Sequence, residues 1–278
     1  MTPSLTIPNV TDLDLAQTLD CGQSFRWTQQ PDGSFSGVAF GRSVNVSLDG
    51  GDLIIHNASK EDEALWREYF DLSLDYGAVR RQISELHPIL KEAARYAPGI
   101  RILRQEPYEA LCTFIISQNN NIKRIKGIVN RLCEHFGEPV DGGFAFPTAE
   151  KMASLTPEEL APLRAGFRAR YLVDAAQKVA SGEVVLENCR HLPYEEAQKE
   201  LMKITGVGVK VADCTLLFGL HRIEAFPVDV WMKRALDVLF PGMSPSDFCE
   251  YAGIAQQYIF HYSRMHPELF AENKKVAK

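Results

Sequence analysis

The sequence predicts an α+β protein that is mainly α, with an antiparallel β-sheet domain over residues 1–98 and an all-α region over residues 99–278. Three observations support this fold class. Short segments before residue 60 alternate apolar with polar residues, which is the period of a half-buried strand. From about residue 99 onward, apolar residues recur at helical spacing. The length of 278 residues is that of about two domains.

The predicted sheet consists of three strands joined by tight turns, which together form a hairpin or a meander. The segments are, in order, a turn at 31–33, strands at 34–40 and 43–48, a turn at 49–51 and a strand at 53–56. Two helical segments follow, at 61–66 and 76–90. An apolar sheet face has to be covered, and we expect these helices to cover it.

The second region is predicted to be a series of helices that form two subdomains. Pro107 is tolerated in the first turn of a helix, and Thr156 is a suitable N-cap with two carboxylates after it. Gly137 follows a long amphipathic segment and ends it. We expect helices that begin near 106 and 156, and helices over 122–136, 170–180, 194–204 and 210–220.

Several classes of protein are excluded by what the sequence lacks. No run approaches the roughly 18 apolar residues of a spanning helix, and the first residues lack the order of a signal peptide. We therefore expect a cytoplasmic protein without a membrane partner. The six cysteines contain no CxxC pair and the seven histidines no HExxH motif, so no zinc or iron-sulfur site is predicted.

The net charge of −6 argues against a polyanionic partner, but the charges are unevenly distributed. Residues 46–92 contain ten acidic and five basic residues, a balance of −5. Residues 95–135 contain seven basic and three acidic residues, a balance of +4. Because the local field steers an anionic ligand, the basic segment is compatible with nucleic acid. A solvated helix face without a partner explains the same charges.

The most specific stretch is a glycine turn between two helices, within a helical hairpin at about 194–220. Gly206 and Gly208 permit a tight connection and leave backbone N–H groups, including that of Val209, unpaired at a helix N-terminus. Such a site suits a phosphate, and the pattern resembles the helix-hairpin-helix element that grips a DNA backbone. A plain helical hairpin without a ligand would show the same pattern.

Lys210 and Asp229 are the candidate catalytic pair. Lys210 stands between two valines at the start of the second helix, where partial desolvation would favour a nucleophilic neutral amine. Asp229 follows a proline segment where a new helix begins, so a carboxylate there could stabilise a developing cation. The alternatives are a surface lysine that contacts phosphate and an aspartate that only caps its helix.

Five sequence blocks stand out along the chain: GQSFRW at 22–27, SQNNNIKRI at 117–125, GFRARY at 166–171, GVGVK at 206–210 with PVDV at 227–230, and AGIAQQYIF at 252–260. These blocks resemble the helix-hairpin-helix base-excision DNA glycosylase superfamily, and within it the 8-oxoguanine DNA glycosylase/AP lyase family. The resemblance extends from residue 21 to residue 260, in family order.

The resemblance implies a role for each matching residue in the base pocket. The carbonyl of Gly22 would accept from N7–H of 8-oxoguanine, whereas the N7 lone pair of guanine would be repelled. Gln256 would bond the Watson-Crick edge of the extruded base, and Phe260 and Cys214 would sandwich its ring. Without the other blocks, core packing on an apolar helix would explain each of these three residues.

A second group would act at the site that the base leaves. Asn119 would fill the gap, and Arg124 and Arg168 would hydrogen-bond the unpaired cytosine. Phe167 stands where the family often has tyrosine, so the wedge keeps its ring without the hydroxyl. Trp231 replaces a smaller polar aromatic residue, which leaves a phosphate contact there in question.

The resemblance thus implies a bifunctional enzyme that excises 8-oxoguanine opposite cytosine from duplex DNA. Lys210 would form a Schiff base and support β-elimination, and Asp229 would stabilise the cationic sugar. We expect a monomer that needs no organic cofactor; related proteins hold a monovalent cation at the hairpin, but no metal ligand is predicted here. The alternatives are a non-catalytic DNA-binding module and a glycosylase for another damaged base.

Overall fold

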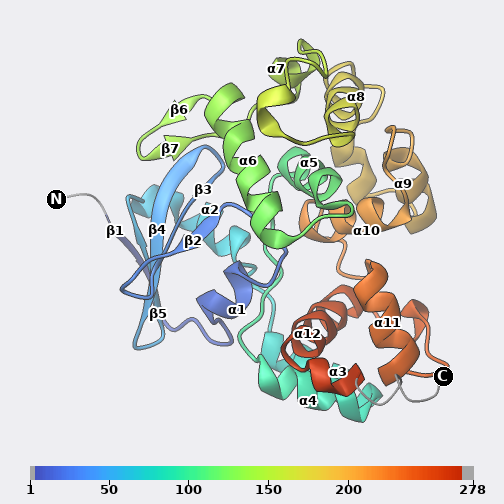
Figure 1. The fold of residues 1–278 in the computed structure, drawn as a ribbon. Helices are drawn as coiled ribbons and strands as arrows, with labels where there is room; N and C mark the ends of the chain where they lie inside the picture. Colours follow the sequence, from blue (N-terminus) through green and yellow to red (C-terminus); the bar gives the residue numbers. More distant parts are fainter. Residues whose placement is uncertain (1–3, 271–278) are drawn as a thin grey trace.

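The computed structural model of the protein describes residues 4–270 (Figure 1). The strands are β1 (Ser4–Ile7), β2 (Trp27–Gln29), β3 (Phe35–Ala39), β4 (Arg42–Asp49), β5 (Asp52–His56), β6 (Pro139–Val140) and β7 (Gly143–Phe144). The α-helices are α1 (Leu15–Leu19), α2 (Glu63–Tyr69), α3 (Tyr76–Leu86), α4 (Pro88–Tyr96), α5 (Pro107–Ser117), α6 (Ile122–Phe136), α7 (Ala149–Ala153), α8 (Arg168–Ala180), α9 (Tyr194–Leu201), α10 (Val209–Phe218), α11 (Val230–Leu239) and α12 (Ala252–Met265). The predicted α+β class, with the sheet first and helices after it, is confirmed.

The sheet has five antiparallel strands in the order β1-β5-β4-β3-β2. The predicted meander is its centre, where Val46 of β4 pairs with Phe35 of β3 and with Ile55 of β5. The turn between β4 and β5 has positive φ at Gly50 and Gly51, the conformation that glycine permits. The edge strands β1 and β2 were not predicted, because four and three residues are too short for alternation to be recognised.

The sheet packs on α1 and α2 and forms a core of its own. Trp27, Val46 and Ile55 from the strands meet Leu19 of α1 and Trp66 of α2, all of them buried. This confirms that the predicted helix at 61–66 covers the sheet, although its α-helical part begins at residue 63.

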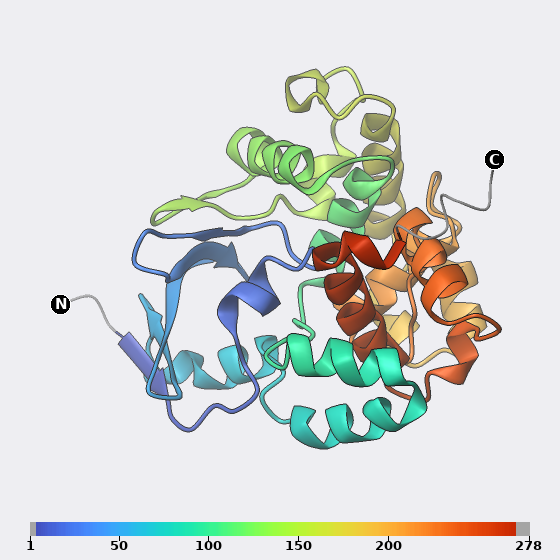
Figure 2. The same ribbon diagram turned by 60° about the horizontal axis from the view of Figure 1, so that its bottom comes forward.

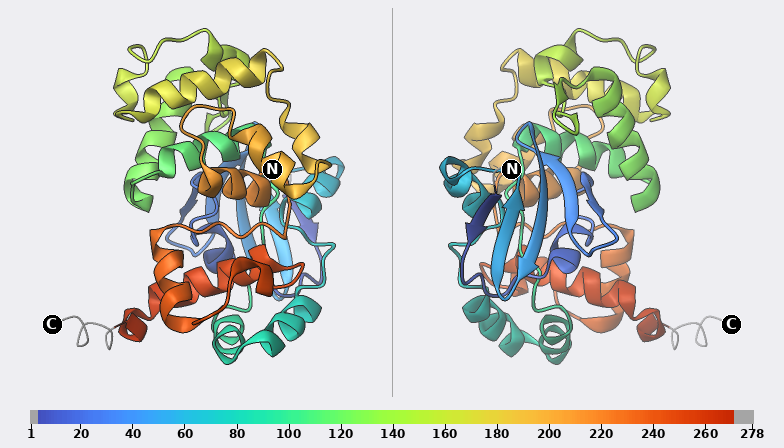
Figure 3. Two further views of the ribbon diagram at one scale, coloured as in Figure 1. Left: turned by 90° about the vertical axis from the view of Figure 1, so that its right-hand side faces the viewer. Right: turned by 90° about the vertical axis from the view of Figure 1, so that its left-hand side faces the viewer.

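The expectation that residues 76–90 also cover the sheet is wrong. They form two helices, because Pro88 cannot continue a helix and the residue before it, His87, is extended. The apolar faces of α3 and α4 belong to the larger helical core, with Ile83 and Leu90 fully buried in it. Figures 2 and 3 show α4 alongside α12.

The remaining helices form two groups. α5 packs on α6, α8 and α10, whereas α12 packs on α4 and α11 (Figure 1). The helix expected at residue 156 is replaced by a turn and a short 3-10 helix, Ala161–Leu163; Thr156 and Glu159 still cap each other, but Pro162 restricts the residue before it. None of the helices in residues 4–270 combines the length and apolar character needed to cross a membrane.

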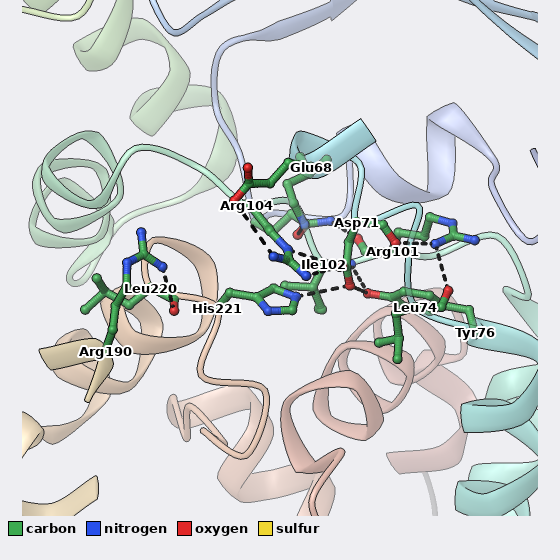
Figure 4. Close-up of polar contacts among 12 residues, drawn as sticks. Glu68, Asp71, Leu74, Tyr76, Arg101, Ile102, Arg104, Arg190, Leu220 and His221 are labelled. Carbon is green, nitrogen blue, oxygen red and sulfur yellow. Dashed lines mark hydrogen bonds and ion pairs between the residues drawn. The ribbon is translucent and has the colours of Figure 1, made fainter. Parts of the chain in front are cut away.

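A buried polar cluster joins the sheet to the helical core (Figure 4). The carboxylate of Asp71, just after α2, accepts from Tyr76 Oη at 2.9 Å and from Arg104 Nη2 at 2.6 Å, and His221 Nε2 lies 3.1 Å from it. Burial alone would raise the pKa of Asp71, but His221 and Arg104 outweigh it and hold the pKa below its usual value. The guanidinium of Arg101 donates to the Asp71 carbonyl. Because His221 follows α10, this cluster ties α10 to the sheet.

Candidate active site

The helical hairpin predicted at 194–220 consists of α9 and α10. Gly206 has φ +81°, and a Cβ there would lie 2.4 Å from the ring of Tyr171, so only glycine fits. Gly208 has no such neighbour, and its missing side chain leaves the start of α10 open. Asp213 of α10 accepts from Tyr194 Oη at 2.6 Å, which holds the two helices together. The N–H groups of the first turn of α10 are therefore presented on a rigid corner.

Lys210 lies in that first turn and is half-buried. Its Nζ donates to Ser117 Oγ at 3.0 Å, and it lies 5.2 Å from the ring centroid of Phe114. Ser117 Oγ in turn donates to the carbonyl of Phe114 at 2.7 Å. The hydroxyl proton is thus directed away from the lysine, and the hydroxyl oxygen accepts from it. This contact fixes the direction of the Lys210 Nζ.

Lys210 lines two adjoining pockets. The outer pocket has a volume of about 360 Å³ and also contains Ser117, Asn121 and Trp231 in its wall. The inner pocket has a volume of about 50 Å³, room for only a few water molecules. Five residues line both pockets: Gly22, Phe114, Lys210, Asp229 and Phe260. The structure therefore brings together residues from five separate parts of the chain.

The loop that carries Gly22 is held by buried side-chain amides. Gly22 has φ +95°, and a Cβ there would lie within 3.6–4.0 Å of Ile122, Phe260 and Arg264. The neighbouring Gln23 is fully buried, donates to the carbonyl of Arg101 at 2.7 Å and accepts from Leu103 N at 2.9 Å. These bonds attach the glycine to the same segment that contacts Asp71.

Cys214 and Gln256 line the inner pocket only. Burial raises the pKa of Cys214 to about 11, against a lowering effect of Lys210, so the thiol is neutral near pH 7 and forms an apolar wall. Gln256 is buried, donates to the Pro227 carbonyl at 3.1 Å and accepts from Gln257 Nε2 at 2.8 Å. Its amide is thereby fixed in one orientation.

Asp229 caps a helix and also faces the pockets. Its Oδ1 accepts from Met232 N at 2.7 Å, so it caps α11. It also lines both pockets together with Lys210. An amine and a carboxylate at one half-buried, largely apolar site can supply a nucleophile and stabilise a cation. Within residues 4–270, no three His, Cys, Asp or Glu side chains are grouped as metal ligands would be.

The residues expected at the vacated base position lie around the loop between α5 and α6. Asn119 is exposed, with φ +47°, and Phe167 is exposed at the start of α8. Arg124 is exposed on α6. Arg168 is buried and lies 4.4 Å from the ring centroid of Phe167. None of these four lines either pocket, although Asn120 and Asn121 line the outer one.

Arg168 is more firmly engaged than the sequence suggests. Its guanidinium makes four of its five possible N–H bonds to backbone carbonyls: Nε and Nη2 donate to Gln118, Nη2 donates to Asn119 at 2.9 Å, and Nη1 donates to Ala165 at 3.1 Å. Burial lowers the pKa of Arg168, and the charge of Arg124 adds to this effect. Arg168 thus holds the loop that carries Asn119.

Several contributors to the site were missed by sequence reasoning, among them Phe114, which lines both pockets. Ser117, Gln23 and Gln257 stand inside the motif blocks, but each has a contact with a residue far away in sequence. Arg264 lines the outer pocket but follows the last motif block, so no motif identified it.

The chain is similar to several known proteins over most of its length. Residues 5–111 match the family model described as 8-oxoguanine DNA glycosylase, N-terminal domain, and residues 112–245 match that of the HhH-GPD superfamily base excision DNA repair protein. The N-glycosylase/DNA lyase of Saccharomyces cerevisiae is 34% identical over 81% of this chain and 68% of its own length. N-glycosylase/DNA lyase OGG1 of Arabidopsis thaliana is 31% identical over 90% of this chain and 77% of its own. The solved structure of Clostridium acetobutylicum 8-oxoguanine glycosylase/lyase, in complex with dsDNA containing cytosine opposite 8-oxoG, superposes with a TM-score of 0.91 at 39% identity, covering 96% of this chain and 97% of that one.

Proposed function

Because this chain belongs to the 8-oxoguanine N-glycosylase/DNA lyase family, we propose that it excises 8-oxoguanine opposite cytosine from duplex DNA and then nicks the strand. The observation that carries the proposal is that Lys210 and Asp229 share both pockets with Gly22 and Phe260. A hairpin that only bound DNA would need neither a pocket nor a lysine inside it. Duplex DNA as substrate agrees with the expected cytoplasmic location, at the nucleoid in a bacterium.

The chemistry begins once the damaged nucleotide is extruded from the helix. The hairpin N–H groups at Gly208 and Val209, beyond the turn at Gly206, hold the DNA backbone near α10. Lys210 Nζ attacks C1′, and the base departs with the electron pair of its glycosidic bond. The bound sugar carries positive charge during this step, and the carboxylate of Asp229 stabilises it. Ring opening yields the Schiff base, from which β-elimination breaks the strand on the 3′ side.

Recognition rests on one hydrogen atom. The Gly22 carbonyl accepts from N7–H, which 8-oxoguanine has and guanine lacks. Gln256, fixed by Pro227 and Gln257, reads the Watson-Crick edge. The ring is held between Phe260 and the neutral thiol of Cys214. Phe260, which is half-buried, lines both the inner and the outer pocket and so stands where the base would pass between them.

The direct test of this function uses the unaltered protein. We expect it to release 8-oxoguanine from a duplex with cytosine opposite, to nick that strand and to form a covalent adduct with it under borohydride. An undamaged duplex is the matched control and should show none of these. Release of another damaged base, with 8-oxoguanine left in place, would favour the alternative substrate class. Binding without release would leave only a DNA-binding module.

The two arginines are expected to differ in their effect on the opposite base. Arg124→Ala should lower the preference for cytosine over adenine, guanine and thymine by about tenfold or more, because Arg124 is the exposed guanidinium next to the gap. Arg168→Ala should slow excision to a similar degree with all four opposite bases, because it releases the loop that carries Asn119. Single-turnover rates on the four duplexes measure both effects. The reverse pattern would show that Arg168 reads the base directly.

Ser117 is expected to position the nucleophile. Ser117→Ala should slow single-turnover base release by about 10- to 100-fold, since misoriented reacting groups cost rates of that order. Duplex affinity should stay within about twofold. Ser117→Thr keeps a hydroxyl that can bond both partners and should recover most of the rate. Equal losses in both variants would indicate a packing defect rather than loss of the hydrogen bond to Lys210.

A further inference from the structure

The outer pocket contains one charged side chain that the steps above do not use, Arg264 in the last turn of α12. Its guanidinium lies 5.3 Å from the ring centroid of Phe260. Nη1 lies 4.0 Å from the position that a Cβ would take at Gly22. Arg264 is exposed, and no carboxylate of residues 4–270 forms an ion pair with it. A positive charge is therefore available at the mouth of the site.

The neighbouring aromatic side chain cannot bind an anion there through its polar atom. Trp231 also lines the outer pocket, but its Nε1–H donates to Ser263 Oγ at 2.8 Å. Ser263 is fully buried, so the indole N–H is directed into the protein. The indole N–H of Trp231 is therefore not available for the phosphate contact considered for it, and Trp231 contributes only its ring to the pocket. The next residue on α12, Arg264, presents the N–H donors of its guanidinium to the outer pocket.

The two pockets indicate which part of a nucleotide Arg264 would meet. Gln256 and Cys214, the proposed base-contacting residues, line the inner pocket and not the outer one. Arg264 lines the outer pocket and not the inner one. A nucleotide whose base lies in the inner pocket has its sugar and phosphates in the outer pocket. Arg264 therefore lies where the sugar-phosphate backbone of the DNA would be.

We propose that Arg264 binds a backbone phosphate next to the extruded nucleotide. This inference rests on the proposed function. A guanidinium presents parallel N–H donors that match two phosphate oxygens, and Arg264 has no carboxylate partner among residues 4–270 to compete with a phosphate. In a chain of net charge −6, such a local contact contributes more to binding than the overall field does.

Equilibrium binding over a series of salt concentrations tests this contact. The binding measurements use the full chain with Lys210→Gln, which prevents turnover, and a duplex with 8-oxoguanine opposite cytosine. Adding Arg264→Gln should weaken binding about tenfold and reduce the slope of log affinity against log salt by about 0.9, the contribution of one phosphate. Arg264→Lys keeps the charge and should restore the slope. Arg95→Gln, at an arginine that pairs with Glu92 and lines neither pocket, removes the same charge and should leave the slope unchanged.

Rates distinguish a phosphate contact from a base contact. With Lys210 intact and enzyme in saturating excess, Arg264→Gln should keep the single-turnover rate of base release within about threefold. An unchanged salt slope together with a large loss of that rate would show that Arg264 acts on the base or sugar, and would overturn the proposal. An unchanged slope and rate would also overturn it. Excision by the unaltered protein in the same assay tests the proposed function separately.

Discussion

Replacement of Lys210 by glutamine is expected to abolish the borohydride adduct and the strand nick, and to reduce base release at least about a thousandfold. Removal of a nucleophile costs at least this much when the rest of the site is intact. Glutamine retains an N–H donor for Ser117 and adds no charge, so the fold and the hairpin should be unaffected. Affinity for the 8-oxoguanine duplex should stay within about threefold, because most of the affinity comes from backbone contacts. Gel analysis of trapped and nicked DNA, together with equilibrium binding, measures all three.

Lys203→Gln is the matched control for this experiment. Lys203 lies at the end of the first hairpin helix, pairs with Glu200 at 2.7 Å and lines neither pocket. The change removes one positive charge near the same DNA contact and should preserve both adduct and nick. If Lys210→Gln continued to release the base while the adduct disappeared, the glycosylase assignment would stand and Lys210 would lose its role as nucleophile in that step.

Asp229→Asn is expected to separate catalysis from stability. Asparagine caps a helix as well as aspartate does, so the bond to Met232 N persists and the melting temperature should stay within about 1 °C. The carboxylate charge is lost from the pocket, and single-turnover base release should fall by about a hundredfold or more. Asp229→Ala should lose the same rate and, in addition, about 1 kcal/mol of unfolding free energy, which corresponds to about 2–4 °C.

A second N-cap provides the control for stability. Asp14 caps α1 through Gln17 N at 2.8 Å and lines neither pocket. Asp14→Ala should therefore lower the melting temperature as Asp229→Ala does, with base release at the unaltered rate. Full activity of Asp229→Asn would mean that Asp229 serves only as the cap of α11.

The sequence predicted local structure better than it predicted packing partners. Alternation identified β3, β4 and β5, whereas β1 and β2 have too few residues to show a period. Periodicity predicted one helix over 76–90 where the structure has α3 and α4, and it contains no information on which element meets their apolar faces. These faces meet the helical core and not the sheet, because the chain turns at Pro88 and α4 packs on α12.

The candidate site shows the same division between local and distant information. Motif spacing identified Lys210 and Gly22, which the fold brings to common pockets. It could not reveal that Arg168 is held by carbonyls about 50 residues earlier, or that Ser117 contacts Lys210 across 93 residues. For Asp229 the residue type suited both a cap and a catalytic carboxylate. The structure gives it the first role and a place where it can perform the second.

The buried carboxylate of Asp71 has a consequence for the accuracy of repair. The glycine proposed to recognise the lesion is fixed through Gln23 to the segment that contains Arg101, and the lysine is carried by the helix that His221 follows. Asp71 contacts both Arg101 and His221 (Figure 4). The position of Gly22 relative to Lys210 thus depends on the contacts of Asp71, a junction that lies outside both pockets. A change at this junction is therefore transmitted to Gly22 and to Lys210 together, so lesion recognition and chemistry are coupled through contacts that neither residue makes itself.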